Sequence, residues 1–255
     1  ALEIAKSIGV ETKLEGTTLY INKGKLNAGK IHINVVEAGL STRLFAPIFA
    51  LKGLHVEMNG EGSILSRPQD MVIEALEELG VKHAHNNGFL PIEIQGRNTK
   101  NNIKIDGSSS SQLLTGLLIA YCVSGIEGVI SVSDLKSKPY VDMTIELLSH
   151  YGFCVKNNKY QSFEIQANQT PKNSDYQVEG DWSGASFLAV SGAIGGEVVL
   201  LGLIALPQML RLGYNQNLAI GTICASGSLG TMIPPSIVLI IYGLITETSI
   251  KALFT

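Results

Sequence analysis

Hydroxyl and amide side chains gather before one strongly apolar stretch of this chain, and together they could hold an anion. Residues Asp106–Ala120 read D-G-S-S-S-S-Q-L-L-T-G-L-L-I-A, so Ser110, Ser111 and Gln112 stand at the start of the apolar run. Such side chains accept hydrogen bonds from the free N–H groups of a helix start, where the helix dipole also favours an anion. On the serine run alone, an ordinary N-cap of a buried helix is the simpler interpretation, and a phosphate or carboxylate site is the alternative.

A second copy of this pattern strengthens the ligand hypothesis. Ser41–Leu51 (S-T-R-L-F-A-P-I-F-A-L) aligns with Ser110–Ala120, and Arg43 then takes the position of Gln112. An arginine just inside a helix N-terminus opposes the helix dipole unless an anion or a carboxylate compensates. Two partners therefore remain open for Arg43, which are an anionic ligand and a nearby acid such as Glu37.

The helices that must position these residues repeat as well. One predicted helix begins at Pro68 and ends before Gly80, and another begins at Pro139 and ends before Gly152. Proline at the first helical position and glycine just past the end is the favoured asymmetry of helices. A looser third copy of the buried helix covers Trp182–Val190. Repeats of this kind define the architecture of a chain.

Short strand patterns separate the helices and complete each repeat. Residues 1–202 therefore predict an α/β fold of repeated β-α-β-α-β-β units, in which several helix N-termini come towards one end. The predicted strands are Thr17–Asn22, Lys30–Val36, His55–Gly60, His83–His85, Glu93–Gln95, Ile103–Ile105, Gly128–Val132, Phe153–Lys156, Phe163–Gln166, Tyr176–Val178 and Val198–Leu201.

Composition excludes several classes of function. The 255 residues carry a net charge of −3, which does not indicate a nucleic-acid-binding surface. Three widely spaced cysteines indicate neither a disulfide framework nor a zinc site, and they fit a reducing compartment. His83 and His85 share a strand face without a third ligand nearby, so a solvated face is favoured and no metal site is predicted. No signal peptide opens the chain, which begins inside a helix pattern, as a fragment would.

Three stretches in correct order resemble the 5-enolpyruvylshikimate-3-phosphate synthase family of the shikimate pathway. They are the serine-rich stretch Asp106–Ala120, the run S-K-P-Y-V-D-M-T from Ser137, and V-E-G-D-W-S-G-A-S-F-L-A from Val178. The resemblance covers Ala1–Gly202. It implies an inverse α/β barrel of two domains, each of three β-α-β-α-β-β units, of which this chain holds one domain. Substrates would lie in the cleft between the two domains, and no cofactor is implied.

The resemblance assigns substrate contacts residue by residue. The residues that match contacts to shikimate 3-phosphate are Ser110, Ser111, Gln112, Ser137 and Tyr140. Each offers a hydroxyl or amide group, which suits a ligand rich in oxygen atoms.

A second group matches the family's contacts to phosphoenolpyruvate. Gly39 leaves room for close approach of this substrate, and Arg43 and Arg67 would bind its charged groups, because the planar guanidinium donates two parallel hydrogen bonds. Asp181 matches an acid of the family, in the run E-G-D. The metal-free reaction so implied transfers the carboxyvinyl group of phosphoenolpyruvate to the 5-hydroxyl of shikimate 3-phosphate, on the way to chorismate and the aromatic amino acids.

This reaction needs neutralised negative charge and acid–base groups at the reacting carbons. The family's aspartate and glutamate for the second task lie on the other domain, and no segment here matches them. We therefore expect the 255-residue chain to bind substrate without turnover, with residues 1–202 in the cytoplasm.

The composition changes after Gly202, since no charged side chain stands between Arg211 and Glu247. Pro234-Pro235 interrupts the apolar run and predicts a broken, apolar helical hairpin over residues 203–255. Two runs, M-L-R-L-G-Y-N-Q-N-L-A-I-G-T and G-S-L-G-T-M-I-P-P-S-I-V-L-I-I-Y, resemble the large membrane subunit of TRAP-type dicarboxylate transporters. A fused transporter fragment with membrane association is expected from this resemblance, and a buried soluble helix pair is the structural alternative. For the chain as a whole, a chimeric gene product without function is a further alternative.

Overall fold

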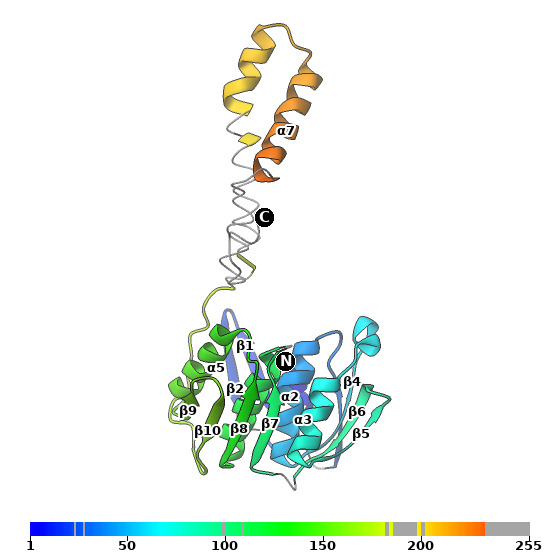
Figure 1. Cartoon of the computed structure of the whole chain (residues 1–255), viewed down its shortest axis with the longest axis vertical. Helices are drawn as coiled ribbons and strands as arrows, with labels where there is room; N and C mark the ends of the chain where they lie inside the picture. Colours follow the sequence, from blue (N-terminus) through cyan, green and yellow to red (C-terminus); the bar gives the residue numbers. More distant parts are fainter. Residues whose placement is uncertain are drawn as a thin grey trace. The chain divides into compact units, whose positions relative to one another are not determined.

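The chain forms two compact units, Ala1–Asp175 and Tyr176–Thr255 (Figure 1). The structure is a computed structural model that describes residues 1–22, 24–27, 29–97, 100–108, 110–181, 184–185, 198–199 and 202–232. The first unit contains both complete copies of the predicted repeat. In the second unit, residues 202–211 are helical, and helix α7 covers Gln216–Met232.

The two repeats have the same order of elements and the same order of strands. The sheets run β3-β4-β6-β5 and β7-β8-β10-β9; in each, the first two strands are parallel and the other neighbours antiparallel. The predicted repetition is thus confirmed. The first repeat comprises β3 (Lys30–Asn34), α2 (Gly39–Lys52), β4 (His55–Asn59), α3 (Asp70–Leu79), β5 (Lys82–Asn86) and β6 (Phe89–Gln95), and the second comprises β7 (Asn102–Asp106), α4 (Gln112–Ser124), β8 (Gly128–Ser133), α5 (Lys138–His150), β9 (Val155–Asn158) and β10 (Ser162–Ile165).

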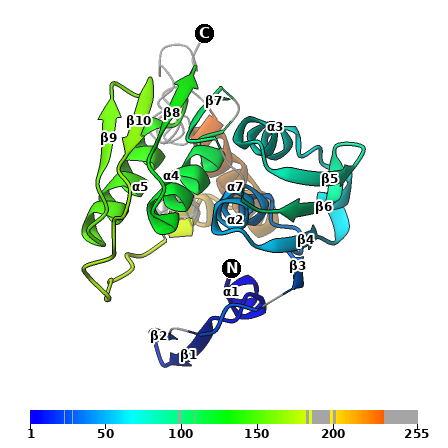
Figure 2. The ribbon, with the colours of Figure 1, turned by 90° about the horizontal axis from the view of Figure 1, so that it is seen from below.

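Helices α2 and α4 lie side by side and parallel in the middle of the first unit, between the two sheets (Figure 2). Near their starts, Arg43 Nη1 donates to Gln112 Oε1 at 2.8 Å, and near their ends Lys52 Nζ donates to the carbonyl of Val123. Gly116 allows the close approach, because a Cβ atom there would stand 2.4 Å from the carbonyl oxygen of Arg43. Buried apolar residues surround both helices, as their sequences predict.

The first sheet alternates between a buried face and a charged face. In β3, Ile31 and Ile33 are buried against the helices, whereas Lys30, His32 and Asn34 point outwards. This alternation is the two-residue period of a half-buried strand.

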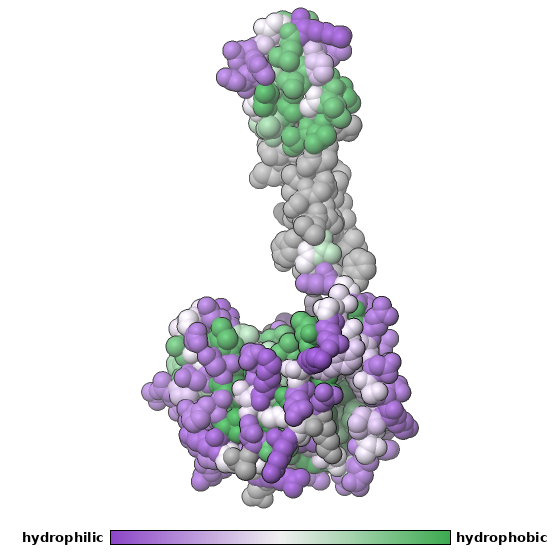
Figure 3. Space-filling view, turned by 180° about the vertical axis from the view of Figure 1, so that it is seen from behind, coloured by the Kyte–Doolittle hydropathy of each residue, from purple (hydrophilic) through white to green (hydrophobic). Residues whose placement is uncertain are grey.

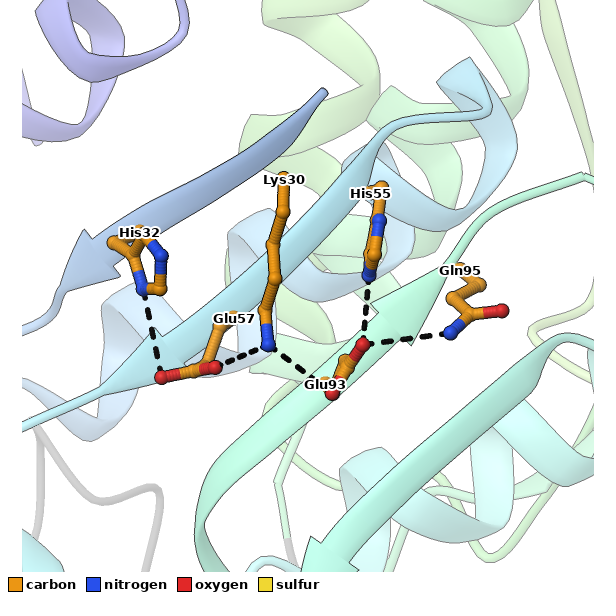
Figure 4. Close-up of polar contacts among 6 residues, drawn as sticks. All are labelled: Lys30, His32, His55, Glu57, Glu93 and Gln95. Atoms are coloured by element: carbon orange, nitrogen blue, oxygen red, sulfur yellow. Dashed lines mark hydrogen bonds and ion pairs between the residues drawn. The ribbon is translucent and has the colours of Figure 1, made fainter.

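A network of charges crosses three strands on the outward face (Figure 4). Lys30 Nζ lies 2.5 Å from a carboxylate oxygen of Glu57 and 3.2 Å from one of Glu93, and His55 Nε2 lies 2.7 Å from the other Glu93 oxygen. Hydrogen bonds from His55, then Lys30 and Gln95, lower the pKa of Glu93 from 4.5 to about 2.

The network makes the stability of the protein depend on acid. Because the folded pKa of Glu93 is depressed, its stabilisation is complete above the unfolded value of 4.5 and disappears as pH falls towards 2. We expect Glu93→Gln to lower the thermal midpoint at pH 7, with a difference from wild type that shrinks between pH 4.5 and 3. Thermal unfolding at a series of pH values measures this, with Glu127→Gln at an exposed carboxyl as control. A difference that stays constant with pH would contradict the prediction.

Several predicted elements differ from the structure. A hairpin of β1 (Glu11–Glu15) and β2 (Thr18–Asn22) replaces the single strand expected at Thr17–Asn22. Residues 62–66 form a short 3₁₀ helix, η1, between β4 and α3. The strand predicted at Tyr176–Val178 is wrong, and residues 198–199 are helical. The chain opens with α1 (Leu2–Ser7), which confirms the helix expected there.

The start of α3 is also corrected. The helix begins at Asp70 and not at Pro68, and Gln69 is its N-cap residue, with φ −110° and ψ 26°. The backbone N–H of Gln69 donates to the carbonyl of Gly88 at 2.8 Å. In α5, by contrast, Pro139 does stand in the first turn as predicted.

The apolar helical hairpin expected over residues 203–255 is not confirmed. Helix α7 continues without a break to Met232, and Pro234-Pro235, where the interruption was expected, lie outside the described residues. Within the described ranges, no helix is long and apolar enough to cross a membrane. Apolar residues are nevertheless exposed on the described helices of this unit, as Figure 3 shows in green.

Candidate functional site

The starts of α2 and α4 bring together the polar residues that the repeat placed in equivalent positions. Arg43 and Gln112, which align in the two repeats, are joined by the 2.8 Å hydrogen bond. Ser110 Oγ accepts from the backbone N–H of Gln112, the first residue of α4, at 3.1 Å. Ser111 is the N-cap residue and is only 5% exposed. Its hydroxyl has no hydrogen-bond partner within the described part of the chain.

A second polar group joins Glu37, just before α2, to Arg67 through Ser63. The Ser63 hydroxyl donates to Glu37 at 2.6 Å, and Arg67 Nη2 donates to the Ser63 oxygen at 2.9 Å. These bonds from Ser63, with the Arg67 charge nearby, lower the pKa of Glu37. Glu37 forms no ion pair with Arg43 among the described residues, so Arg43 has Gln112 as its partner and not the acid considered above.

Gly62 is required for this arrangement. Its φ of +57° lies in the left-handed region, and a Cβ atom there would stand 2.7 Å from the Glu37 carboxyl group. A side chain at position 62 would therefore both strain the backbone and push Glu37 away from Ser63.

Gly39 is the first residue of α2, beside the Arg43 side chain. A Cβ atom at Gly39 would lie 3.8 Å from Arg43 Nη1 and 3.5 Å from Ile64 Cδ1, which are ordinary contact distances. The fold alone thus tolerates alanine at this position. A larger side chain would occupy the space next to the guanidinium, where an anion would bind.

The start of α5 supplies the remaining predicted contacts. Ser137 has φ +56°, a left-handed conformation that side-chain-bearing residues seldom adopt and that is typical of functional positions. The N–H of Lys136 donates to the carbonyl of Gly107 at 3.2 Å and fixes the loop before Ser137. Ser137 and Tyr140 are exposed, so both can reach a ligand.

Two threonines connect α5 to α4. Thr115 Oγ1 and Thr144 Oγ1 are 2.9 Å apart, and Thr144 Oγ1 also donates to the carbonyl of Tyr140 at 2.8 Å. The start of α5 is thereby held in register with the helix that carries Gln112. These residues and Ser63 were not predicted from the sequence, although Thr115 is a hydroxyl residue on an otherwise apolar helix and so carried a signal.

Asp181 is not placed with the other predicted residues. It belongs to the second unit, where its Oδ1 accepts from the N–H of Gly184 at 2.9 Å, as an N-cap side chain does. Most of the third repeat helix expected at Trp182–Val190 lies outside the described residues. The eight substrate-binding candidates, in contrast, all lie in the first unit.

Three hollows of the first unit lie away from these eight residues. One, of about 500 Å³, lies between α3 and β7 and is lined by five acidic side chains and Lys104. Negative potential there would repel a phosphate. The candidate site is instead an open surface with guanidinium, hydroxyl, amide and phenol groups, which can bind an anionic, hydroxylated ligand.

Comparison with known proteins agrees with this surface chemistry. Residues 1–214 match the family described as EPSP synthase (3-phosphoshikimate 1-carboxyvinyltransferase). Proteins of that name from Clostridium kluyveri and Clostridium novyi are 33% and 34% identical to the chain over 204 and 211 residues. These alignments cover 79% and 78% of this chain but 48% of each relative, so the chain spans about half the length of the curated relatives it matches.

The fold comparison leads to the same group of proteins. EPSP synthase from Acinetobacter baumannii superposes with a TM-score of 0.62 at 22% identity, over 76% of this chain and 44% of that one. Residues 182–255 separately match the DctM component of tripartite ATP-independent periplasmic transporters. The two family matches overlap at residues 182–214, and the predicted boundary between residues 202 and 203 falls inside this overlap. By sequence over most of its length and by fold, the chain belongs to the EPSP synthase family.

Proposed function

We propose that the first unit carries half of the substrate site of a 3-phosphoshikimate 1-carboxyvinyltransferase acting in the cytoplasm. The observation that supports this most directly is the Arg43–Gln112 hydrogen bond, which joins the N-termini of two parallel buried helices. Each helix start carries partial positive charge, and Arg43 adds a full one. An anion at this junction would meet both.

The two substrates divide the surface between them in this proposal. Phosphoenolpyruvate binds beside Gly39, with Arg43 and Arg67 on its charged groups. Shikimate 3-phosphate binds across the starts of α4 and α5, where its contacts are Ser110, Ser111, Gln112, Ser137 and Tyr140.

Asp181, in the second unit, is a catalytic candidate only through its match to the family's run E-G-D. The 255-residue chain alone binds without turnover, because the groups gathered in the first unit neutralise charge and do not supply a matched acid and base. Glu37, two residues before α2, has a lowered pKa and is therefore a weak proton acceptor. The chain's span of about half its relatives agrees with a site completed by a further domain.

Calorimetric titration with shikimate 3-phosphate tests the proposal. We expect weak, saturable binding by the wild-type chain, and about tenfold weaker binding by Ser137→Ala, the effect of losing one charge-assisted hydrogen bond of about 1.5 kcal/mol. Ser149→Ala, at the other end of α5, is the matched control and should bind as the wild type does. Equal affinity of Ser137→Ala and wild type would remove Ser137 from the site, and no binding by the wild type would overturn the proposal.

A second candidate concerns residues 203–255 alone. Their match to a transporter component and their exposed apolar side chains favour a fused fragment of a sodium-coupled dicarboxylate transporter, associated with a membrane through this segment. The candidate requires one continuous transcript across the codons for Gly202–Ile204. Sequenced RNA that never crosses this junction would remove it.

A further inference from the structure

The turn between β9 and β10 has an unusual backbone for its sequence. The N–H of Gln161 donates to the carbonyl of Asn158 at 3.1 Å, and the two central residues, Lys159 and Tyr160, have φ of +54° and +59°. Positive φ at both central positions defines a type I′ turn, which favours Asn-Gly. Here, two residues with long side chains occupy it instead.

The first repeat has the favoured residues at the corresponding hairpin tip, in a loop one residue shorter, since Asn86 pairs with Phe89 whereas Asn158 pairs with Ser162. Between β5 and β6, Asn87 and Gly88 have φ of +48° and +89°. Both hairpins connect the last two strands of their repeat. The second repeat therefore keeps a strained turn although the same fold also accommodates a relaxed one. Strain of this kind indicates a role for a side chain in the turn, and Tyr160 is the candidate.

Tyr160 contacts the start of α5 through both its ring and its hydroxyl. The hydroxyl lies 2.9 Å from each carboxylate oxygen of Asp142, and Lys138 Nζ lies 5.2 Å from the ring centroid, a cation–π distance. The bond to Asp142 raises the pKa of Tyr160, so the hydroxyl remains a donor at neutral pH. Lys138 and Asp142 flank Tyr140, and Lys138 directly follows Ser137.

The hairpin of the first repeat holds its own second helix at the same place, but with its backbone. The carbonyl of Gly88 accepts from the N–H of Gln69, the residue before α3. Arg67 stands two residues earlier, as Ser137 stands just before α5. In both repeats, a hairpin tip thus fixes the helix start that carries a proposed substrate contact.

We propose that Tyr160 is a positioning residue, which sets the start of α5 through Asp142 and Lys138 so that Ser137 and Tyr140 meet shikimate 3-phosphate. This inference rests on the proposed function. The contacts of the Tyr160 side chain to Asp142 and Lys138 compensate for the strained backbone of the turn. Tyr160 itself is half-buried, so a purely structural role must be separated from positioning.

Exchanging the turn for that of the first repeat separates the two roles. The double replacement Lys159→Asn with Tyr160→Gly installs Asn-Gly, which relieves the positive φ values and removes the contacts to α5. Positioning predicts a thermal midpoint equal to or above that of wild type, together with about tenfold weaker binding of shikimate 3-phosphate by calorimetry. A purely structural role predicts a lower midpoint with unchanged affinity.

Tyr160→Phe keeps the ring over Lys138 and removes only the bond to Asp142, so its affinity should fall between those of wild type and the double variant. Tyr20→Phe, on the β1–β2 hairpin, is the control and should bind as wild type does. If the wild type binds shikimate 3-phosphate and both Tyr160 variants bind it with the wild-type affinity, the inference is overturned while the proposed function stands. If wild type itself does not bind, the proposed function fails and the inference fails with it. Tyr160→Phe alone decides the case should the double variant not fold.

Discussion

Replacing Gly116 by alanine is expected to lower the free energy of unfolding by about 3 kcal/mol, the upper range for overpacking a core. At an open helical position, the same replacement would stabilise the protein by about 1 kcal/mol through helix propensity. Here, the new methyl group would stand 2.4 Å from the carbonyl oxygen of Arg43 and 2.9 Å from Leu44 Cα. Both are backbone atoms of a buried helix, so they can yield only if α2 and α4 move apart.

Urea unfolding followed by circular dichroism measures this effect. The control is Gly221→Ala in α7, a helical glycine at which the added methyl group meets no atom within 4 Å beyond its own helix backbone and chain neighbours, and which should not destabilise the chain. The separation of α2 from α4 should also lengthen the Arg43–Gln112 contact and weaken binding of shikimate 3-phosphate. A Gly116→Ala protein as stable as wild type would mean that the helices do not pack as closely as the structure shows.

The repeated architecture was predictable because the signals for it are local. Buried helices and half-buried strands have characteristic periods, and two copies of one pattern at matching intervals predict two copies of one unit. The alignment of Arg43 with Gln112 predicted only equivalent positions in separate repeats. The two side chains are in contact because α2 and α4 pack in parallel, with their N-termini next to each other.

Contacts between residues far apart in the sequence could not be predicted from local patterns. Glu37 was the nearest acid in the chain to Arg43, yet Ser63 binds Glu37 through both its hydroxyl and its N–H. Likewise, Pro68 carries a helix-start signal, but the helix begins at Asp70, and the N–H of Gln69 before it binds the Gly88 carbonyl. Neither partner can be read from local pattern, since each lies about twenty or more residues away.

The strained positions were unpredictable for a different reason. Ser137, Lys159 and Tyr160 all have positive φ, although none is among the residues that favour it. Propensity argues against such conformations, so only the surrounding contacts can impose them. Lys159 and Tyr160 form the turn proposed to position α5, and Ser137 belongs to the proposed substrate site. Departures from local preference are expected at such functional positions.

The chain ending at Gly202 is expected to be several times more soluble than the full chain. Among the described residues of the second unit, apolar side chains face solvent, including Leu203, Leu212 and Leu218 at 71%, 76% and 61% exposure. Exposed apolar patches larger than a few hundred Å² promote association. Removing these residues should therefore reduce aggregation, even though the shorter chain loses part of the region matched to its family.

Point replacements within the full chain provide the sharper comparison, because they keep its length. Leu203→Ser, Leu212→Ser and Leu218→Ser together should raise the soluble share after centrifugation. The matched control replaces three exposed apolar residues of the first unit, Leu14, Ile21 and Leu26, by serine. These contribute comparable apolar area but lie around a small hairpin, so the control should change solubility less. An equal gain from both sets would show that exposed apolar area in general, and not the second unit, governs association.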